Sequence, residues 1–406
     1  MITGRLAGLL FIFAVLALGI AAFWIFQPEP PEDRQKLQPV TFASLEGWET
    51  DAMDQALGAF QVSCRRILTF PAERSMGGGG MAGTAADWKP ACEAAVALPP
   101  TDAEGARRFF QTWFRPARVQ NNGDDIGLFT GYYEPVLNGS LTREGAFTTP
   151  LYAVPPHHIS VDLGEFRTEW KGQRIVGQVE GNRLRPAESR KEIDAGALTG
   201  KATPLVWVDD PVDAFFLHIQ GSGLVTFPDG STRRVGFAAT NGQRYYAVGK
   251  TLIDKGEVSS DQMSMQAIRA WMEKNAGQAQ GLMEENPSYV FFRFLEGTAP
   301  VGSTGVGLTP GRSLAIDPKW IAYGIPLWLD LNVNPKDAAN RRQTQLRRLL
   351  VAQDTGGAIR GIVRGDVYWG TGDDAANLAG AMKEYGRYYA LLPRDLLARQ
   401  AKEGGN

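Results

Sequence analysis

The spacing of apolar residues changes character near residue 127. Before it, the segment "DAMDQALGAFQVSCRRIL" from Asp51 carries apolar side chains three and four positions apart, as in an amphipathic helix. A second helix is predicted at Trp88–Ala97, and a third at "TDAEGARRFFQTWF", where Thr101 is expected to be the N-cap and Glu104 to complete a capping box. The first 115 residues are therefore predicted to pack as helices.

From Gly127 onward, short apolar runs alternate with Gly, Pro and Asn, a pattern typical of strands joined by turns. Pro228-Asp229-Gly230-Ser231 is predicted to be a hairpin turn, because Gly230 can adopt a positive φ. His218 alternates with apolar residues and is placed on a strand. The runs are "GLFTGYYEPVL", "TPLYAV", "PLVWVDD", "AFFLHIQGSGLVTF" and "TRRVGFAA".

A helical interlude is predicted over residues 246–275, with Ser260 as its cap. Glycine-punctuated strands then resume, and a final helix is predicted to begin near Asp373. The later strands are "SYVFFRFL", "LAID", "PLWLDL", "RRLLVAQD" and "GIVRGDVYWG".

The N-terminal residues predict export. Arg5 precedes a run of uncharged, mostly apolar residues that ends at Phe26, and a polar, Pro-rich stretch follows. The run fits either an uncleaved membrane anchor or a signal peptide cut near Ala21 or Ala22. We therefore expect a periplasmic protein that is membrane-anchored or secreted through residues 1–26.

Composition narrows the chemistry. With 42 basic and 44 acidic side chains, the chain has no global attraction for nucleic acid, and no nucleic-acid partner is expected. Cys64 and Cys92 are the only cysteines; in an oxidising compartment they could form a disulfide, but two thiolates make a poor metal site. With only three histidines, no metal or other cofactor is expected, and carboxylates are the best candidates for catalysis.

Asp354-Thr355-Gly356 is the triplet of aspartic proteases, which need two such aspartates sharing one proton. The chain holds one copy, so proteolysis is disfavoured and Asp354 is interpreted as a turn residue that accepts backbone N–H bonds. Asp366 lies in "RGDVYWGTG", where Tyr368 shares its strand face and aromatic neighbours could wall off an acid. This setting favours carbohydrate chemistry only weakly.

Several long motifs together are similar to the membrane-bound lytic murein transglycosylase A family, over nearly all of residues 127–394. They are "GLFTGYYEPVL", "DAFFLHIQGSGLV", "NGQRYYAVGKTL", "NPSYVFFR" and "GVGLTPGRSLAIDPKWIAYGIPLWLD", followed by the stretch that holds Asp354 and Asp366. The C-terminal part also resembles the three-aspartate module, whose acids fall on Asp317, Asp354 and Asp366.

The resemblance implies a mainly β fold with helices: a double-ψ β-barrel that carries an inserted second β domain, with a wide groove between them. The implied organisation is a signal peptide or anchor at 1–26, a linker at 27–50, a helical part of domain 1 at 51–132, the inserted domain at 133–295 and the barrel part of domain 1 at 296–398.

The implied reaction is cleavage of the β-1,4 bond between N-acetylmuramic acid and N-acetylglucosamine in peptidoglycan, with a 1,6-anhydromuramoyl end as product. The resemblance makes Asp366 the catalytic acid and base, supported by Asp354, Asp317, Thr130 and Tyr132. Sugar contacts are implied for Gln220, Gly221, Ser222 and Tyr368, although the first three could also form a simple bend.

The expected partners are glycan strands, the membrane through the N-terminal segment, and cell-wall synthesis or division complexes, with the protein itself a monomer. Two alternatives stay open: a non-catalytic peptidoglycan-binding protein and a muramidase that uses water.

Overall fold

The computed structural model describes residues 32–297, 300–331 and 346–403. The apolar segment at 1–26, predicted to be an anchor or signal peptide, lies outside these ranges. Within them, no helix combines the length and the apolar character needed to cross a membrane.

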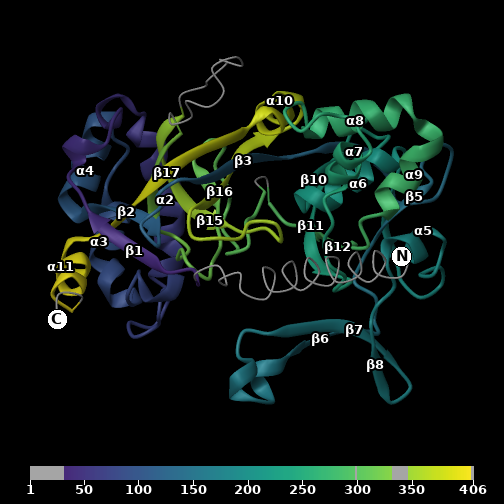
Figure 1. Ribbon diagram of the computed structural model, residues 1–406, viewed down its shortest axis with the longest axis horizontal. Helices are drawn as coiled ribbons and strands as arrows, with labels where there is room; N and C mark the ends of the chain where they lie inside the picture. The colour runs from purple at the N-terminus through teal and green to yellow at the C-terminus, as the bar shows by residue number, and fades with distance from the viewer. Residues whose placement is uncertain (1–31, 298–299, 332–345, 404–406) are drawn as a thin grey trace, which may run out of the picture. The chain divides into compact units, whose positions relative to one another are not determined.

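A closed β-barrel is formed by strand β3 together with strands from the C-terminal part of the chain. The eight-stranded sheet has the order β1-β2-β17-β14-β15-β13-β16-β3, and an additional pairing of β17 with β3 closes a ring of β3 and β13 to β17. Figure 1 labels β3, β15, β16 and β17 of this ring. Pairings β13–β15 and β16–β3 are parallel, so the barrel is not a simple meander. The ring strands are β3 Gly127–Glu134, β13 Ser313–Ala315, β14 Pro326–Asp330, β15 Arg347–Asp354, β16 Arg364–Thr371 and β17 Lys383–Pro393.

Two further strands, β1 Gln35–Pro39 and β2 Phe114–Asn121, extend the sheet from β17. The prediction that the first 115 residues are purely helical is therefore wrong at both ends. Strand β1 also falls within the range 27–50 that was expected to be a linker.

Helices α2 Met53–Ile67, α3 Ala85–Ala97 and α4 Ala103–Trp113 form where the apolar spacing predicted them, and α11 Arg394–Glu403 ends the described chain. Their apolar faces share one core with the barrel, in which Phe60, Trp88 and Trp328 are almost fully buried. The cap of α4 is Asp102, whose carboxylate accepts from the Gly105 N–H, and not Thr101 as predicted.

Between β3 and β13 the chain forms a second sheet of six strands in the order β12-β11-β10-β4-β9-β5. The hairpin of β10 and β11 has Gly230 at φ 80°, as the turn sequence predicts. The strands are β4 Val136–Ser140, β5 Thr149–Tyr152, β9 Pro204–Val208, β10 Ser222–Thr226, β11 Thr232–Thr240 and β12 Val290–Leu295.

The helices of this region correct two predictions. His218 lies on α6 Pro211–Gln220 and not on a strand, because Asp210 caps a helix there with Pro211 in its first turn. The cap of α8 Met265–Lys274 is Ser264 and not Ser260. The remaining helices are α5 Arg190–Asp194, α7 Val248–Asp254, α9 Ala276–Glu284 and, on the barrel, α10 Asp373–Ala381.

A small third sheet consists of β6 His158–Asp162, β7 Arg174–Glu180 and β8 Arg183–Arg185, all antiparallel (Figure 1).

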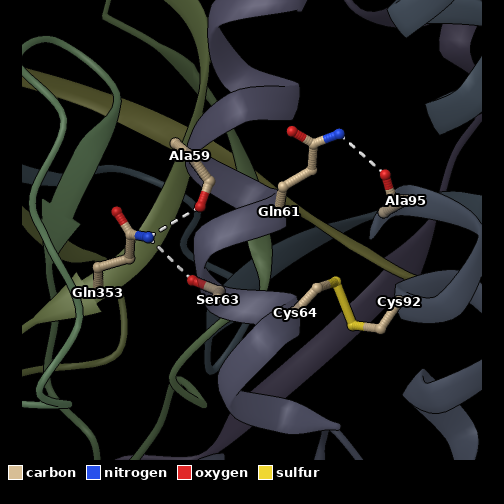
Figure 2. The surroundings of a disulfide bond; sticks show 7 residues. All are labelled: Ala59, Gln61, Ser63, Cys64, Cys92, Ala95 and Gln353. Carbon is tan, nitrogen blue, oxygen red and sulfur yellow. Dashed lines mark hydrogen bonds between the residues drawn. A yellow bond between two sulfur atoms is a disulfide. The ribbon is translucent and has the colours of Figure 1, made fainter. Parts of the chain in front are cut away.

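A disulfide joins Cys64 of α2 to Cys92 of α3, which settles the open pairing of the two cysteines (Figure 2). Both cysteines are fully buried. On the same helix, next to Cys64 and five residues before it, the Gln353 side chain of β15 donates to the Ser63 hydroxyl and to the Ala59 carbonyl, each at 2.9 Å. Helix α2 is therefore fixed both to its neighbouring helix and to a barrel strand.

We predict that replacing both cysteines by Ala lowers the free energy of unfolding. The crosslink spans 28 residues of sequence, for which loop-closure entropy gives roughly 3 to 4 kcal/mol. Urea unfolding of the oxidised protein and of the double variant measures the difference. The control is Ala91→Ser, which perturbs the same helix but leaves the crosslink in place; equal stability of the double variant and the oxidised protein would contradict the prediction.

Candidate functional site

Asp366 lies in the middle of β16, and the parallel pairing of β16 with β3 sets it opposite Thr130. The Thr130 hydroxyl donates to Asp366 Oδ1 at 2.6 Å. The Asp366 residue as a whole is half-buried. The pairing of two strands from distant parts of the chain thus orients this carboxyl.

Burial is the largest influence on the pKa of Asp366 and raises it, the Thr130 hydroxyl and the Arg364 guanidinium act to lower it, and the negative charge of Asp354 adds to the rise. Together these influences raise the pKa of Asp366 to about 6. A carboxyl with this pKa is populated in both protonation states near neutral pH. It can therefore both give and take a proton there.

Asp354 ends strand β15 and is held by three donors. The Tyr132 hydroxyl donates to Oδ2 at 2.8 Å, and the backbone N–H groups of Ser303 and Thr355 donate to Oδ1 at 2.9 Å each. The turn role inferred from the sequence is therefore what the structure shows. Burial nevertheless raises the pKa of Asp354 above its ordinary value.

The two aspartates both face Ala315 of β13 in the sheet register. Within the described residues, no hydrogen bond joins the Asp354 and Asp366 carboxyls. They therefore do not form the proton-sharing pair that aspartic proteolysis requires.

Asp317 is 5% exposed and accepts from the backbone of two loops: Lys319 N–H to Oδ1 at 3.1 Å and Gly361 N–H to Oδ2 at 2.9 Å. These contacts pin the loop that precedes β16.

Tyr368 is 2% exposed, and its ring centroid lies 5.3 Å from that of Tyr132. Burial raises the pKa of its hydroxyl to about 12, so the phenol stays neutral. A ring buried to this extent presents no face on which a sugar could stack. The sugar contact that the resemblance implies for Tyr368 stays a prediction.

Gln220, Gly221 and Ser222 form the turn from α6 into β10, with Gly221 at φ 82° as the helix C-cap. The side-chain oxygen Oε1 of Gln220 accepts from the Tyr133 backbone N–H at 3.1 Å, and the side-chain Nε2 donates to the Met265 sulfur at 3.1 Å. The Gln220 side chain therefore connects the end of α6 to Tyr133 of β3, the strand that also carries Thr130 and Tyr132. This is a helix-to-strand turn and not the hairpin bend considered from the sequence.

The sequence did not predict the contacts of two charged residues close to Thr130 and Asp366. Arg364 Nη2 donates to the Thr130 hydroxyl oxygen at 2.9 Å; its position two residues before Asp366, on the same strand face, was the available signal. Glu134 is fully buried and pairs with Arg234 of β11 at 2.9 and 3.2 Å, while the Thr371 hydroxyl donates to it at 2.6 Å.

The opposite face of β3 requires a glycine. A Cβ on Gly131 would lie 2.7 Å from Trp369 Nε1 and 2.8 Å from the Cα of Ala379 on α10. Helix α10 can therefore pack directly against β3 and β16 behind Thr130 and Asp366. Among the described residues, no group of three or more His, Cys, Asp or Glu side chains is arranged to hold a metal ion.

Comparisons with known proteins agree with this geometry. Residues 128–293 match the family model of the MltA specific insert domain, and residues 312–392 match the 3D domain. Membrane-bound lytic murein transglycosylase A of Escherichia coli K12 is 38% identical over 266 residues, and the match covers 65% of this chain and 65% of that relative. Its Vibrio cholerae counterpart is 34% identical, over 66% of this chain and 67% of the relative.

Solved structures are similar over a larger share. A membrane-bound lytic murein transglycosylase from Agrobacterium tumefaciens is 30% identical with a TM-score of 0.79, covering 90% of this chain and 99% of that one. MltA from Neisseria gonorrhoeae is 34% identical with a TM-score of 0.73, covering 90% and 96%. E. coli MltA with bound chitohexaose is 28% identical with a TM-score of 0.64, covering 91% and 93%. With its mainly β fold, in which a double-ψ β-barrel carries an inserted second β domain, the chain belongs to the membrane-bound lytic murein transglycosylase A family.

Proposed function

We propose that the protein is a lytic murein transglycosylase, a lyase that cleaves the β-1,4 bond between N-acetylmuramic acid and N-acetylglucosamine in peptidoglycan. The observation that carries the proposal is one half-buried carboxyl, Asp366, with its pKa raised to about 6 and one oxygen held by Thr130. The bound chitohexaose of E. coli MltA, a structure similar to this chain, supports a glycan ligand.

The reaction needs one acid that later serves as a base. The protonated Asp366 gives its proton to the glycosidic oxygen as the bond from that oxygen to C1 of the muramoyl residue breaks, and N-acetylglucosamine leaves. The Asp366 carboxylate then accepts the proton of the muramoyl C6 hydroxyl as O6 attacks C1. The product is a 1,6-anhydro ring, and the acid is restored.

Intramolecular attack explains why one carboxyl suffices. Glycosidases that use water or a covalent intermediate place two carboxyl groups on the two sides of the bond. Here the nucleophile is already attached to the sugar, and a well-oriented intramolecular group has an effective molarity that can reach about 10⁵–10⁸ M. Both carboxylate oxygens of Asp354 accept hydrogen bonds from protein donors, and Asp354 takes no part in proton transfer.

We further propose the domain boundaries 133–295 for the inserted domain and 296–398 for the barrel part, with 51–132 completing domain 1 and the substrate groove between the two domains. Residues 1–26 anchor the protein in the membrane or export it, and residues 27–50 connect that segment to the periplasmic enzyme. The chain spans 65% of the length of its E. coli relatives. We also propose that the protein is a monomer and that it takes part in complexes with other cell-wall proteins.

Mass spectrometry of sacculi digested by the full-length protein in detergent tests the function. We expect new glycan ends that are 1,6-anhydromuramoyl and 18 Da lighter than hydrated reducing ends, as the chemistry above requires. Reducing ends would instead identify a muramidase that uses water. Binding without any new ends would identify a non-catalytic peptidoglycan-binding protein.

We predict that Asp366→Asn abolishes turnover while glycan binding survives, because the amide keeps the shape of the side chain but has no transferable proton. General acid–base groups contribute about 10²–10⁴ in rate, and a group that acts twice is expected at or above the top of that range. Sacculus digestion and glycan pull-down on the same preparation measure the two effects.

The matched variant is Asp354→Asn. We expect it to lose only part of the activity and about 2 kcal/mol of stability, because it weakens charge-assisted bonds to backbone N–H groups. An inactive but folded, glycan-binding Asp354→Asn beside a fully active Asp366→Asn would show that the other aspartate is the acid.

We predict that kcat/KM falls as pH rises through about 6, because the free enzyme needs Asp366 protonated and burial raises its pKa to about 6. The charged or titratable groups around it are Arg364 on its own strand, Tyr132 on β3 and Asp354 on β15. Burial keeps the pKa of Tyr132 well above its usual value, so it stays neutral. A pH–rate profile on a soluble glycan measures the midpoint; a midpoint near 4 would contradict the prediction.

A further inference from the structure

Arg364 lies on β16 two residues before Asp366, so both side chains project from one face of the strand. Its guanidinium crosses to β3, where Nη1 donates to the Leu128 carbonyl at 3.2 Å and Nη2 donates to the Thr130 hydroxyl oxygen at 2.9 Å. It also donates to the Gly365 carbonyl. The side chain is half-buried and lies at the junction of the two strands that hold the acid.

The chemistry of these groups fixes the direction of the hydrogen bonds. A guanidinium has donors only, so the Thr130 oxygen must accept from Arg364. A hydroxyl has one hydrogen, and among the described residues the Thr130 hydroxyl donates to Asp366 Oδ1 and to no other acceptor. Asp366 Oδ1 is therefore an acceptor, and the transferable proton is favoured on Oδ2, because a protonated Oδ1 would be a weaker acceptor for the Thr130 hydroxyl.

We propose that Arg364 is a positioning residue, which orders the Thr130 hydroxyl as a donor to Asp366 Oδ1 and so confines the catalytic proton to Oδ2. This inference rests on the proposed function. Without Arg364, the Thr130 hydroxyl is free to turn and accept from a protonated Oδ1. The proton would then be shared between two oxygens, of which one faces Thr130 and not the substrate.

A purely structural role is the competing explanation, because Arg364 also binds carbonyls of Leu128 and Gly365 and so ties β16 to β3. The two roles differ in what they change. A structural role affects stability and the amount of folded protein. A positioning role affects the pH dependence and kcat, and it requires Thr130 in order to act.

The test compares the full-length protein in detergent with Arg364→Met, Arg364→Lys, Thr130→Val, Thr130→Ser and the Arg364→Met/Thr130→Val double variant. Arg360→Met is the control for loss of one positive charge, because Arg360 is exposed and, within the described part of the chain, its side chain donates to the carbonyls of Gly356 and Ile359 alone. Each protein is measured by its pH–rate profile on a soluble glycan, by kcat and KM, and by its melting curve.

For Arg364→Met we expect a kcat about tenfold lower at low pH. We also expect the pH at which the rate falls to be higher by on the order of one pH unit, because removal of the nearby positive charge raises the pKa of the carboxyl. KM should stay within about twofold, because the sugar subsites are untouched. Thr130→Val should behave similarly, Thr130→Ser and Arg364→Lys should recover most of kcat, and Arg360→Met should match the parent protein.

The double variant decides between the two roles. If Arg364 acts through Thr130, the double variant is no slower than the worse single variant. Two results would overturn the proposal. One is a double variant whose loss of kcat is the product of the two single losses while the midpoint of the pH–rate profile is unchanged. The other is a loss of kcat that follows the melting temperature alone in all variants.

A measurement that does not need turnover separates this inference from the proposed function. Carbon NMR of protein with labelled Asp, assigned with Asp366→Asn, reports the titration of the Asp366 carboxyl directly. We expect its midpoint to rise in Arg364→Met and to stay unchanged in Arg360→Met. A rise in a protein that makes no anhydro ends would leave the positioning role in place and remove the transglycosylase function, whereas an unmoved midpoint would overturn the positioning role itself.

Discussion

The parallel pairing of β3 with β16 is the contact on which the rest of the structure depends. It joins Thr130 to Asp366, residues 236 positions apart in the sequence. Strand β3 also pairs with β17, so the same strand closes the barrel. Parallel neighbours cannot be connected by a short turn, and here the chain between them forms both the second sheet and the barrel strands β13 to β15. The surroundings of Asp366 thus depend on a pairing between distant parts of the chain.

The end of β3 also couples that second sheet to the barrel. Glu134 is fully buried where β3 ends and is neutralised by Arg234 of β11, with Thr371 of β16 as a further donor. Removing one partner of such a pair costs about 3–5 kcal/mol, because the other charge stays buried without compensation. Gln220 adds a second connection, from α6 to the backbone of Tyr133. The strand that carries Thr130 is therefore held by the barrel on one side and by the inserted sheet on the other.

The sequence predicted most of the helices and strands and, by resemblance, the residues that lie around Asp366. The prediction of secondary structure was wrong where the spacing of apolar residues carries little information. Strand β1 reads "QKLQP", without regular alternation, and forms only because β2 offers it an edge. The run "AFFLHI" is apolar at nearly every position, so a buried helix and a buried strand look the same, and Asp210 with Pro211 was the clue to the helix. Arg364 could not be assigned a role because its contact with Thr130 depends on the register between two distant strands.

The two aspartates illustrate how two strands of one sheet can give two carboxyl groups different surroundings. Asp354 has three protein donors and remains an acceptor, so its negative charge adds to the burial that raises the pKa of Asp366. Arg364 and Thr130 oppose that rise, and the balance leaves the pKa at about 6. Had the two carboxyls been in contact, they would have shared one proton, as in aspartic proteases. Because β13 separates them in the sheet, the charge of Asp354 acts on Asp366 through space, and the proton stays with the residue that Thr130 orients.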